Sequence, residues 1–109
     1  MNRLAAVVLI VGLTAAVAAP AMAQDAKAGK GHDVFVAQKC QMCHSVEGQG
    51  NKNHPLDGVG STMKPEEIKK YITSPKDVKA DSKMKAYPSI PAEDLDALVA
   101  YISSLKKKA

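Results

Sequence analysis

The sequence has no tryptophan, one phenylalanine and three tyrosines among its 109 residues. Large apolar side chains are therefore scarce, and a domain this small usually needs disulfides, a metal or a cofactor to be stable. The length excludes a multidomain enzyme, because it allows one short domain at most. Runs that alternate apolar and polar residues, as half-buried strands do, are also lacking, so we expect an all-α chain.

The first residues resemble an export signal. Met1–Arg3 places a positive charge before the apolar run Leu4–Ala19, and the small-residue pattern Ala21-Met22-Ala23 follows. This order is typical of a secretory signal peptide. We expect a signal peptide over residues 1–23 and one domain over 24–109, exported to the periplasm and without a membrane span after cleavage. An uncleaved leader acting as an anchor is the alternative, because the apolar run is only slightly short of spanning length.

The two cysteines of the chain lie in Cys40-Gln41-Met42-Cys43-His44. This spacing is the pattern for covalent attachment of a c-type haem. Two thiols three positions apart on one turn can each add to a different vinyl group of one porphyrin, and the adjacent imidazole then faces the iron. We therefore predict one haem c on Cys40 and Cys43, with His44 as an iron ligand. The porphyrin would also supply the interior that the side chains lack.

Three other uses of the cysteine pair are weaker. A thioredoxin-like dithiol expects a βαβ surrounding and has no need of His44. A zinc site needs four ligands, and the sequence has no second cysteine pair. A plain disulfide is compatible with export, but it leaves the histidine unexplained.

The sixth iron ligand decides the function. A protein side chain in that position closes the iron to other ligands and leaves electron transfer as its role, whereas an open position binds gases or peroxide. The candidates are His32, His54, Met42, Met63 and Met84. Met42 lies inside the attachment turn and cannot reach the opposite face. We favour Met84, an apolar thioether between two lysines in a polar stretch without periodicity. Met63 is suited to pack on Ile68 at the start of a helix, but Met63 and His54 stay open as alternatives.

Three helices are predicted, joined by loops. The first runs from about Asp25 to the cysteine motif, and the second covers Pro65–Thr73, with Pro75 as its stop. The third starts with Pro91 at its first position and carries an apolar stripe of Leu95, Leu98, Val99, Ile102 and Leu105. The glycine-bearing loop after the cysteine motif is long enough to wrap a ligand.

Together these motifs resemble the class I c-type cytochromes, small electron carriers with a single haem. The shared features are Gly31-x-x-Val34-Phe35, Cys40-x-x-Cys43-His44, Pro55-Leu56-x-Gly58, Lys83-Met84 and a closing helix with Leu98 and Tyr101. The resemblance implies three to four short helices around one covalent haem, with the first and last helices crossing. It implies that Gly31 lets the helix backbones approach and that Phe35 packs on Leu98 and Tyr101.

The same resemblance assigns roles at the haem. It implies His44 and Met84 as the axial ligands, with the Pro55 carbonyl accepting the Nδ1–H of His44. The usual Gly-Pro-x-Leu is here His54-Pro55-Leu56, one residue shorter. The tryptophan frequent in the middle helix is missing, and Tyr71 could stand in its place, binding a haem propionate or packing in the core.

Our expected function is a soluble, monomeric, non-enzymatic one-electron carrier of the periplasm. The alternative is a haem-based sensor or minor peroxidase in which the sixth ligand is labile. The predicted partners are acidic redox proteins, since five lysines lie near the attachment and ligand loops (Lys39, Lys76, Lys79, Lys83 and Lys85); ordinary solvated lysines are the alternative. Nucleic acid is not expected as a partner, because no binding motif or aromatic platform accompanies the basic charge.

Overall fold

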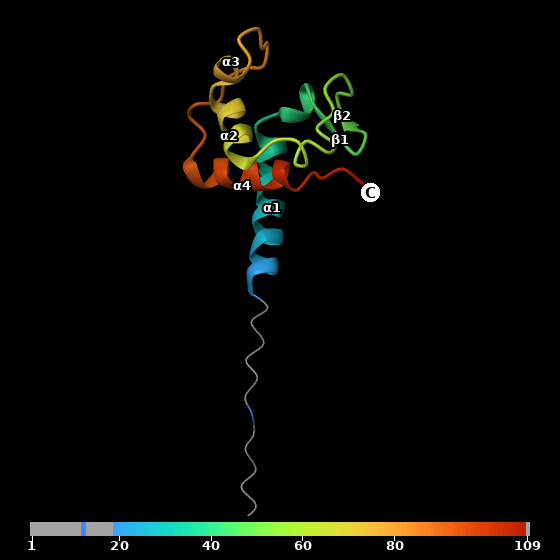
Figure 1. Ribbon diagram of the computed structural model, residues 1–109, viewed down its shortest axis with the longest axis vertical. Coiled ribbons are helices and arrows are strands. Elements are labelled where there is room, and N and C mark those ends of the chain that lie inside the picture. The colour runs from blue at the N-terminus through green and yellow to red at the C-terminus, as the bar shows by residue number, and fades with distance from the viewer. Residues whose placement is uncertain (1–11, 13–18, 109) are drawn as a thin grey trace, which may run out of the picture.

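The computed structural model describes Gly12 and residues 19–108 of the chain. Most of the predicted signal peptide, residues 1–23, lies outside these residues. The elements in chain order are α1 (Ala19–Ala37), a 3-10 turn η1 (Cys40–Met42), β1 (Ser45–Val46), β2 (Gln49–Gly50), α2 (Pro65–Thr73), α3 (Pro75–Val78) and α4 (Ala92–Ser103). Figure 1 shows α4 lying across α1, with α2 and α3 to one side of the crossing and the β1–β2 hairpin to the other. This arrangement confirms the predicted helical fold.

The crossing of α1 and α4 depends on one glycine. A Cβ added to Gly31 would lie 2.6 Å from both the carbonyl carbon of Ala97 and the Cβ of Tyr101. Side chains do not approach so closely, so the two helix backbones can meet here only without a side chain. Beside this contact the rings of Phe35 and Tyr101 meet edge to face at 5.6 Å between centroids. The predicted role of Gly31 and the packing of Phe35 on Tyr101 are confirmed.

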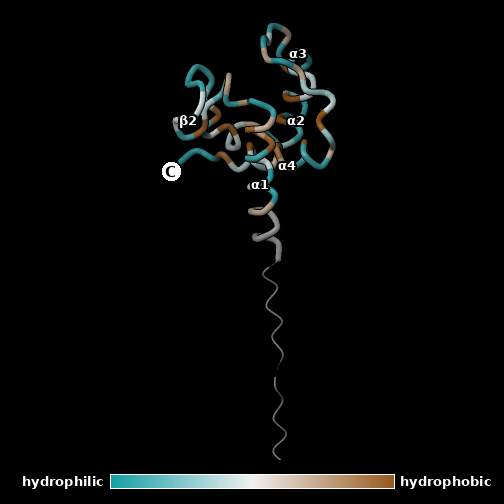
Figure 2. Tube along the Cα trace, turned by 180° about the vertical axis from the view of Figure 1, so that it is seen from behind, coloured by the Kyte–Doolittle hydropathy of each residue, from teal (hydrophilic) through white to brown (hydrophobic). Residues whose placement is uncertain are grey.

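Three helices supply the core. Its buried apolar side chains are Val34 and Phe35 from α1, Ile68 and Ile72 from α2, and Leu95, Leu98, Val99 and Ile102 from α4. Figure 2 shows the hydrophobic segments gathered where these helices meet and hydrophilic segments at the outer turns. Within the described part of the chain, no helix combines the length and the apolar character that a membrane crossing requires.

The helix boundaries agree with the sequence pattern except at two starts. α2 covers the predicted Pro65–Thr73. α1 is already helical at Ala19, the first described residue of this stretch and six residues before the predicted start at Asp25. Pro91 is the residue before α4 rather than its first helical position, a shift of one residue. α3 was not predicted; Pro75, which ends α2, also begins this single turn because proline suits a first helical position.

The hairpin was not predicted either. β1 and β2 pair antiparallel, with Ser45 opposite Gly50. The turn between them places Glu47 at φ 50° and Gly48 at φ 79°. Turns of this kind usually contain Asn-Gly or Asp-Gly, which makes them recognisable in a sequence. The glutamate at the first position of this turn gives no such indication.

The end of the chain returns along the loop before α2. The Gly60 N–H donates to the Leu105 carbonyl at 2.9 Å, and the Lys106 ammonium donates to the Gly60 carbonyl at 2.6 Å. The Lys107 N–H donates to the Ser61 hydroxyl at 2.8 Å. We call Leu105–Lys107 the C-terminal strap, because it ties down the loop that follows the cysteine motif.

Candidate functional site

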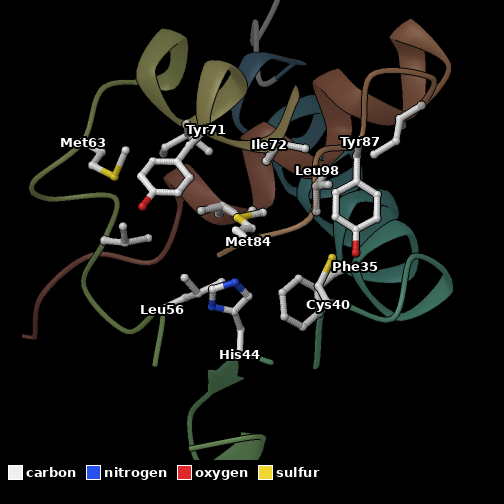
Figure 3. A pocket seen from close by; sticks show the side chains of 14 residues that line it. Phe35, Cys40, His44, Leu56, Met63, Tyr71, Ile72, Met84, Tyr87 and Leu98 are labelled. Atoms are coloured by element: carbon white, nitrogen blue, oxygen red, sulfur yellow. The ribbon is translucent and has the colours of Figure 1, made fainter. Parts of the chain in front are cut away.

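A hydrophobic cavity opens between the core and the loops, with about 550 Å³ of space when the open volume at its mouth is included. Its lining residues come from almost every part of the fold: Phe35, Cys40, His44, Leu56, Val59, Met63, Ile68, Tyr71, Ile72, Met84, Tyr87, Ile90, Leu98 and Ile102. Figure 3 shows the His44 imidazole reaching into the cavity from one side and the Met84 sulfur on the opposite side. Cys40 lies beside them, next to Tyr87.

The cysteine motif occupies a tight turn at the edge of the cavity. Lys39 adopts a left-handed conformation, φ 60°, which reverses the chain between α1 and η1. Cys40 is then half-buried in the cavity wall, whereas Cys43 is exposed. Burial is the main reason why the pKa of the Cys40 thiol is raised to about 11. Cys40 thus lines the cavity, and Cys43 lies at the surface of the same turn.

The hairpin fixes this turn. Asn51 donates its backbone N–H to the Gln41 carbonyl at 2.9 Å and its side-chain Nδ2 to the Met42 carbonyl at 3.0 Å. The neighbouring Gly50 has φ +100°, and a Cβ there would lie 3.0 Å from the Gln41 carbonyl oxygen. The segment from Gln49 to Asn51 therefore holds the backbone of the Cys40–Cys43 turn in place.

His44 is prepared to bind a metal through one nitrogen. Its Nδ1 lies 3.0 Å from the carbonyl oxygen of His54, which accepts the Nδ1–H. This hydrogen bond fixes the tautomer and leaves the Nε2 lone pair free. Burial lowers the pKa of the His44 imidazole, and the nearby His54 lowers it further, while the hydrogen bond to the His54 carbonyl acts in the opposite direction. The ring is thus kept in its neutral form, the form that coordinates metals.

The prediction that Pro55 accepts this hydrogen bond is wrong. Pro55 is exposed, pairs along the backbone with Ser45 and does not line the cavity. The reason is the missing residue in the motif. In a Gly-Pro-x-Leu motif the proline lies two positions before the leucine. Two positions before Leu56 lies His54, and the carbonyl at that position is the one that accepts the hydrogen bond. Leu56 fixes the register, because its N–H donates to the Ser45 carbonyl at 2.8 Å.

Of the five candidates for a sixth iron ligand, two methionines line the cavity. His54 is exposed, and its ring lies 6.1 Å from that of His44, on the same side of the cavity. His32 is an exposed residue that meets Tyr101 edge-on, and Met42 is 66 % exposed. Met63 and Met84 both line the cavity. In Figure 3 Met63 lies toward Tyr71, at the margin, whereas Met84 faces His44.

The loop that carries Met84 is irregular but tied to the fold. Met84 is partly buried, while Lys83 and Lys85 on either side are exposed. The Met84 N–H donates to the hydroxyl of Ser82 at 3.2 Å, and the Tyr87 N–H donates to the Ile72 carbonyl of α2 at 2.9 Å. The loop thereby turns one apolar side chain inward and its charges outward.

Tyr71 and Tyr87 line the cavity from different sides. Figure 3 shows Tyr71 near Met63 and Tyr87 beside Cys40. Tyr71 was expected to bind a haem propionate or to pack in the core, because it could stand in for the tryptophan that is frequent in the middle helix. Tyr87 was not identified from the sequence. An aromatic residue three positions after Met84, followed by a proline, was the available signal.

The comparisons with known proteins agree with the geometry. The family model for cytochrome c matches residues 28–106. A curated relative, cytochrome c oxidase subunit 2 of Alkalihalophilus pseudofirmus, is 32% identical in an alignment of 88 residues that covers 72% of this chain and 26% of the relative. The chain thus spans about a quarter of the relative that it matches. No solved structure gives a significant match. The chain belongs to the cytochrome c family.

Members of this family carry a covalently attached haem c, and the residues of the cavity fit that group. The walls are apolar and suit a porphyrin face, the Cys40-x-x-Cys43 pair lies at the edge, and the His44 Nε2 is free to bind iron. In the cytochrome c family this group serves electron transfer.

Proposed function

We propose that this chain is a soluble periplasmic one-electron carrier whose haem iron is held between His44 and Met84. One observation carries the proposal: the His44 imidazole and the Met84 sulfur line a single apolar cavity from opposite sides, beside the Cys40 thiol (Figure 3). In this proposal Cys40 and Cys43 form the two thioether bonds. The haem, when bound, supplies the ferric–ferrous couple.

The protein groups determine how that couple behaves. Two side-chain ligands keep the coordination number the same in both oxidation states, so little rearrangement accompanies electron transfer. The soft sulfur of Met84 favours ferrous iron and raises the potential above that of a bis-imidazole site. The His54 carbonyl orients the imidazole of His44. The apolar walls exclude water, which further favours the less charged ferrous state.

Replacing the two methionines in turn tests the ligand assignment. Met84→Ala should lower the reduction potential, abolish the weak long-wavelength methionine–iron band of the ferric spectrum and allow the reduced protein to bind carbon monoxide. Met63→Ala removes the same side chain from the margin of the same cavity and should leave all three properties near those of the unmodified protein. The reverse result would assign the sixth position to Met63.

The same measurement separates the carrier from the alternative function. A sensor or peroxidase has an open or labile sixth position, so its reduced form would bind carbon monoxide rapidly and stoichiometrically without any substitution. We expect the unmodified protein to bind carbon monoxide poorly at neutral pH. Rapid binding would replace the carrier with the sensor or peroxidase.

We further propose that redox partners dock on the surface around the Cys40–Cys43 turn, where the haem would be attached. Met42 is 66 % exposed there, and Lys39 precedes the exposed turn. Lys85 reaches the same side, since its ammonium lies 5.6 Å from the ring centroid of Tyr87, which neighbours Cys40 in Figure 3. An apolar centre flanked by lysines fits a partner with acidic groups around its own redox centre.

Oxidation of the reduced protein by ferricyanide tests this surface. Lys39→Glu and Lys85→Glu should slow the second-order rate at low ionic strength more than Lys108→Glu, which makes the same charge change at the end of the chain. The differences should vanish at high salt. Equal slowing by all three variants would mean that only net charge matters and that these lysines are ordinary solvated residues.

Export and processing are tested by mass. In our proposal the periplasmic protein is residues 24–109 with one haem. The intact mass of the purified protein reports cleavage after Ala23 and covalent haem together. A mass that includes residues 1–23 would instead support an anchored carrier.

A further inference from the structure

The loop that carries Met84 contains an unusual buried hydroxyl. Among the described residues two polar side chains are buried, those of Ser45 and Ser82, and Ser82 is 8 % exposed. Its neighbours Asp81 and Lys83 are both exposed. A buried hydroxyl is costly unless it makes hydrogen bonds, so its position calls for a role inside the loop.

Ser82 connects Met84 to the base of its own loop. The Ser82 hydroxyl oxygen accepts the N–H of Met84 at 3.2 Å, and the Ser82 N–H donates to the Lys79 carbonyl at 2.9 Å. Between residues 80 and 88 of the described chain, one further backbone group is tied, the Tyr87 N–H to the Ile72 carbonyl. That bond holds the far end of the loop. The Ser82 hydroxyl is the contact made at Met84 itself.

We propose that Ser82 is a positioning residue that holds Met84 in the cavity and thereby sets how often the sixth position of the iron opens. This inference rests on the proposed ligation by Met84. The lysines on either side of Met84 are already exposed and do not hold the loop inward. The inward position of the thioether therefore depends on its apolar packing, on the proposed iron–sulfur bond and on this short tether. Removing the hydroxyl loosens the tether without changing either iron ligand.

The expected change in the affinity for an external ligand follows from the strength of the hydrogen bond that Ser82→Ala removes. A neutral hydrogen bond contributes about 1 kcal/mol, which corresponds to a factor of about five in an equilibrium constant. An external ligand binds only when Met84 has left the iron, so its apparent affinity rises in proportion to the open fraction. Ser82→Ala should therefore strengthen binding of an external ligand about fivefold.

The test uses the haem-containing protein and its Ser82→Ala and Ser89→Ala variants. Ser89 is an exposed serine at the end of the same loop and is the matched control. Imidazole is titrated against the ferric protein, and amide hydrogen exchange is followed at Met84 and at Leu98 in the core. In Ser82→Ala, imidazole affinity and Met84 exchange should both rise about fivefold while Leu98 exchange stays the same. Ser89→Ala should change none of them by more than about twofold.

Two results would overturn the inference. One is unchanged imidazole affinity and unchanged Met84 exchange in Ser82→Ala. The other is equal acceleration at Met84 and Leu98, because a general loss of stability affects the core as well. The proposed function fails separately, if Met84→Ala and the unmodified protein bind imidazole alike. Exchange at the Met84 amide would still show in that case whether Ser82 holds the loop.

Discussion

Replacing Gly31 by alanine should force α1 and α4 apart, and Gly29 in the same helix provides the matched control. The new Cβ at position 31 would lie 2.6 Å from the Tyr101 Cβ and the Ala97 carbonyl carbon. The Ala97 carbonyl oxygen would be closer still, and ordinary contacts begin near 3.4 Å, so the helices must separate by at least about 0.8 Å at the crossing. A Cβ on Gly29 meets nothing within 4 Å.

The loss in the free energy of unfolding that this separation causes can be estimated. A gap of this size removes between a quarter and a half of the attraction between facing atoms, and the atoms that must move belong to helix backbone. We therefore expect Gly31→Ala to lie at the upper end of the overpacking range and to reduce the free energy of unfolding by about 3 kcal/mol. Gly29→Ala should raise it by up to about 1 kcal/mol, because alanine is the better helix former.

Denaturant unfolding of the haem-containing protein, followed by circular dichroism, measures the difference. The same chemical change at two positions of one helix should give stabilities that differ by about 4 kcal/mol, the sum of the two estimates. The melting temperature of Gly31→Ala should fall by on the order of 15 °C. If the two variants agree within about 1 kcal/mol, the close helix crossing at Gly31 is not what stabilises this fold.

Three further outcomes are expected. Tyr71→Phe should shift the reduction potential if the hydroxyl binds a propionate, and a change in stability alone would assign Tyr71 to the core. Lys106→Met should reduce the free energy of unfolding by about 1 kcal/mol through loss of the bond to the Gly60 carbonyl, whereas the exposed Lys108→Met should not. In the haem-free chain, where His44 is not bound to iron, acid should destabilise the fold: the folded pKa of His44 is lowered from 6.5, so its contribution is complete above pH 6.5 and is lost as the pH falls through the lower folded value. Unfolding titrations between pH 7 and pH 4 should show this loss, and a flat profile would contradict it.

The parts of the fold that sequence predicts are those with strong local signals. Pro65 and the spacing of Ile68 and Ile72 define α2 because proline suits a first turn and apolar residues recur at helical intervals. α4 follows from the same pattern. Cys40 was predicted at the cavity because the cysteine spacing is chemically specific, and Met84 because an apolar residue stood out in a polar loop.

The parts that sequence misses depend on backbone geometry. The left-handed Lys39 has a side chain with no preference for that conformation, and the hairpin turn begins with Glu47 instead of asparagine or aspartate. The His54 carbonyl acts through its backbone, so the identity of the residue gives no hint of the role. Ser82 is one serine among several, and it is distinguished by its burial, which it shares with Ser45, together with its hydrogen bond to the Met84 N–H.

The C-terminal strap has a consequence for the order of events during biosynthesis. Leu105–Lys107 ties down the Gly58–Ser61 segment, and this segment continues the loop whose carbonyl orients His44. These residues follow His44 by about sixty positions, so the ribosome adds them well after the cysteine motif. A nascent chain can therefore present its cysteines before the loop beside the imidazole receives this tether.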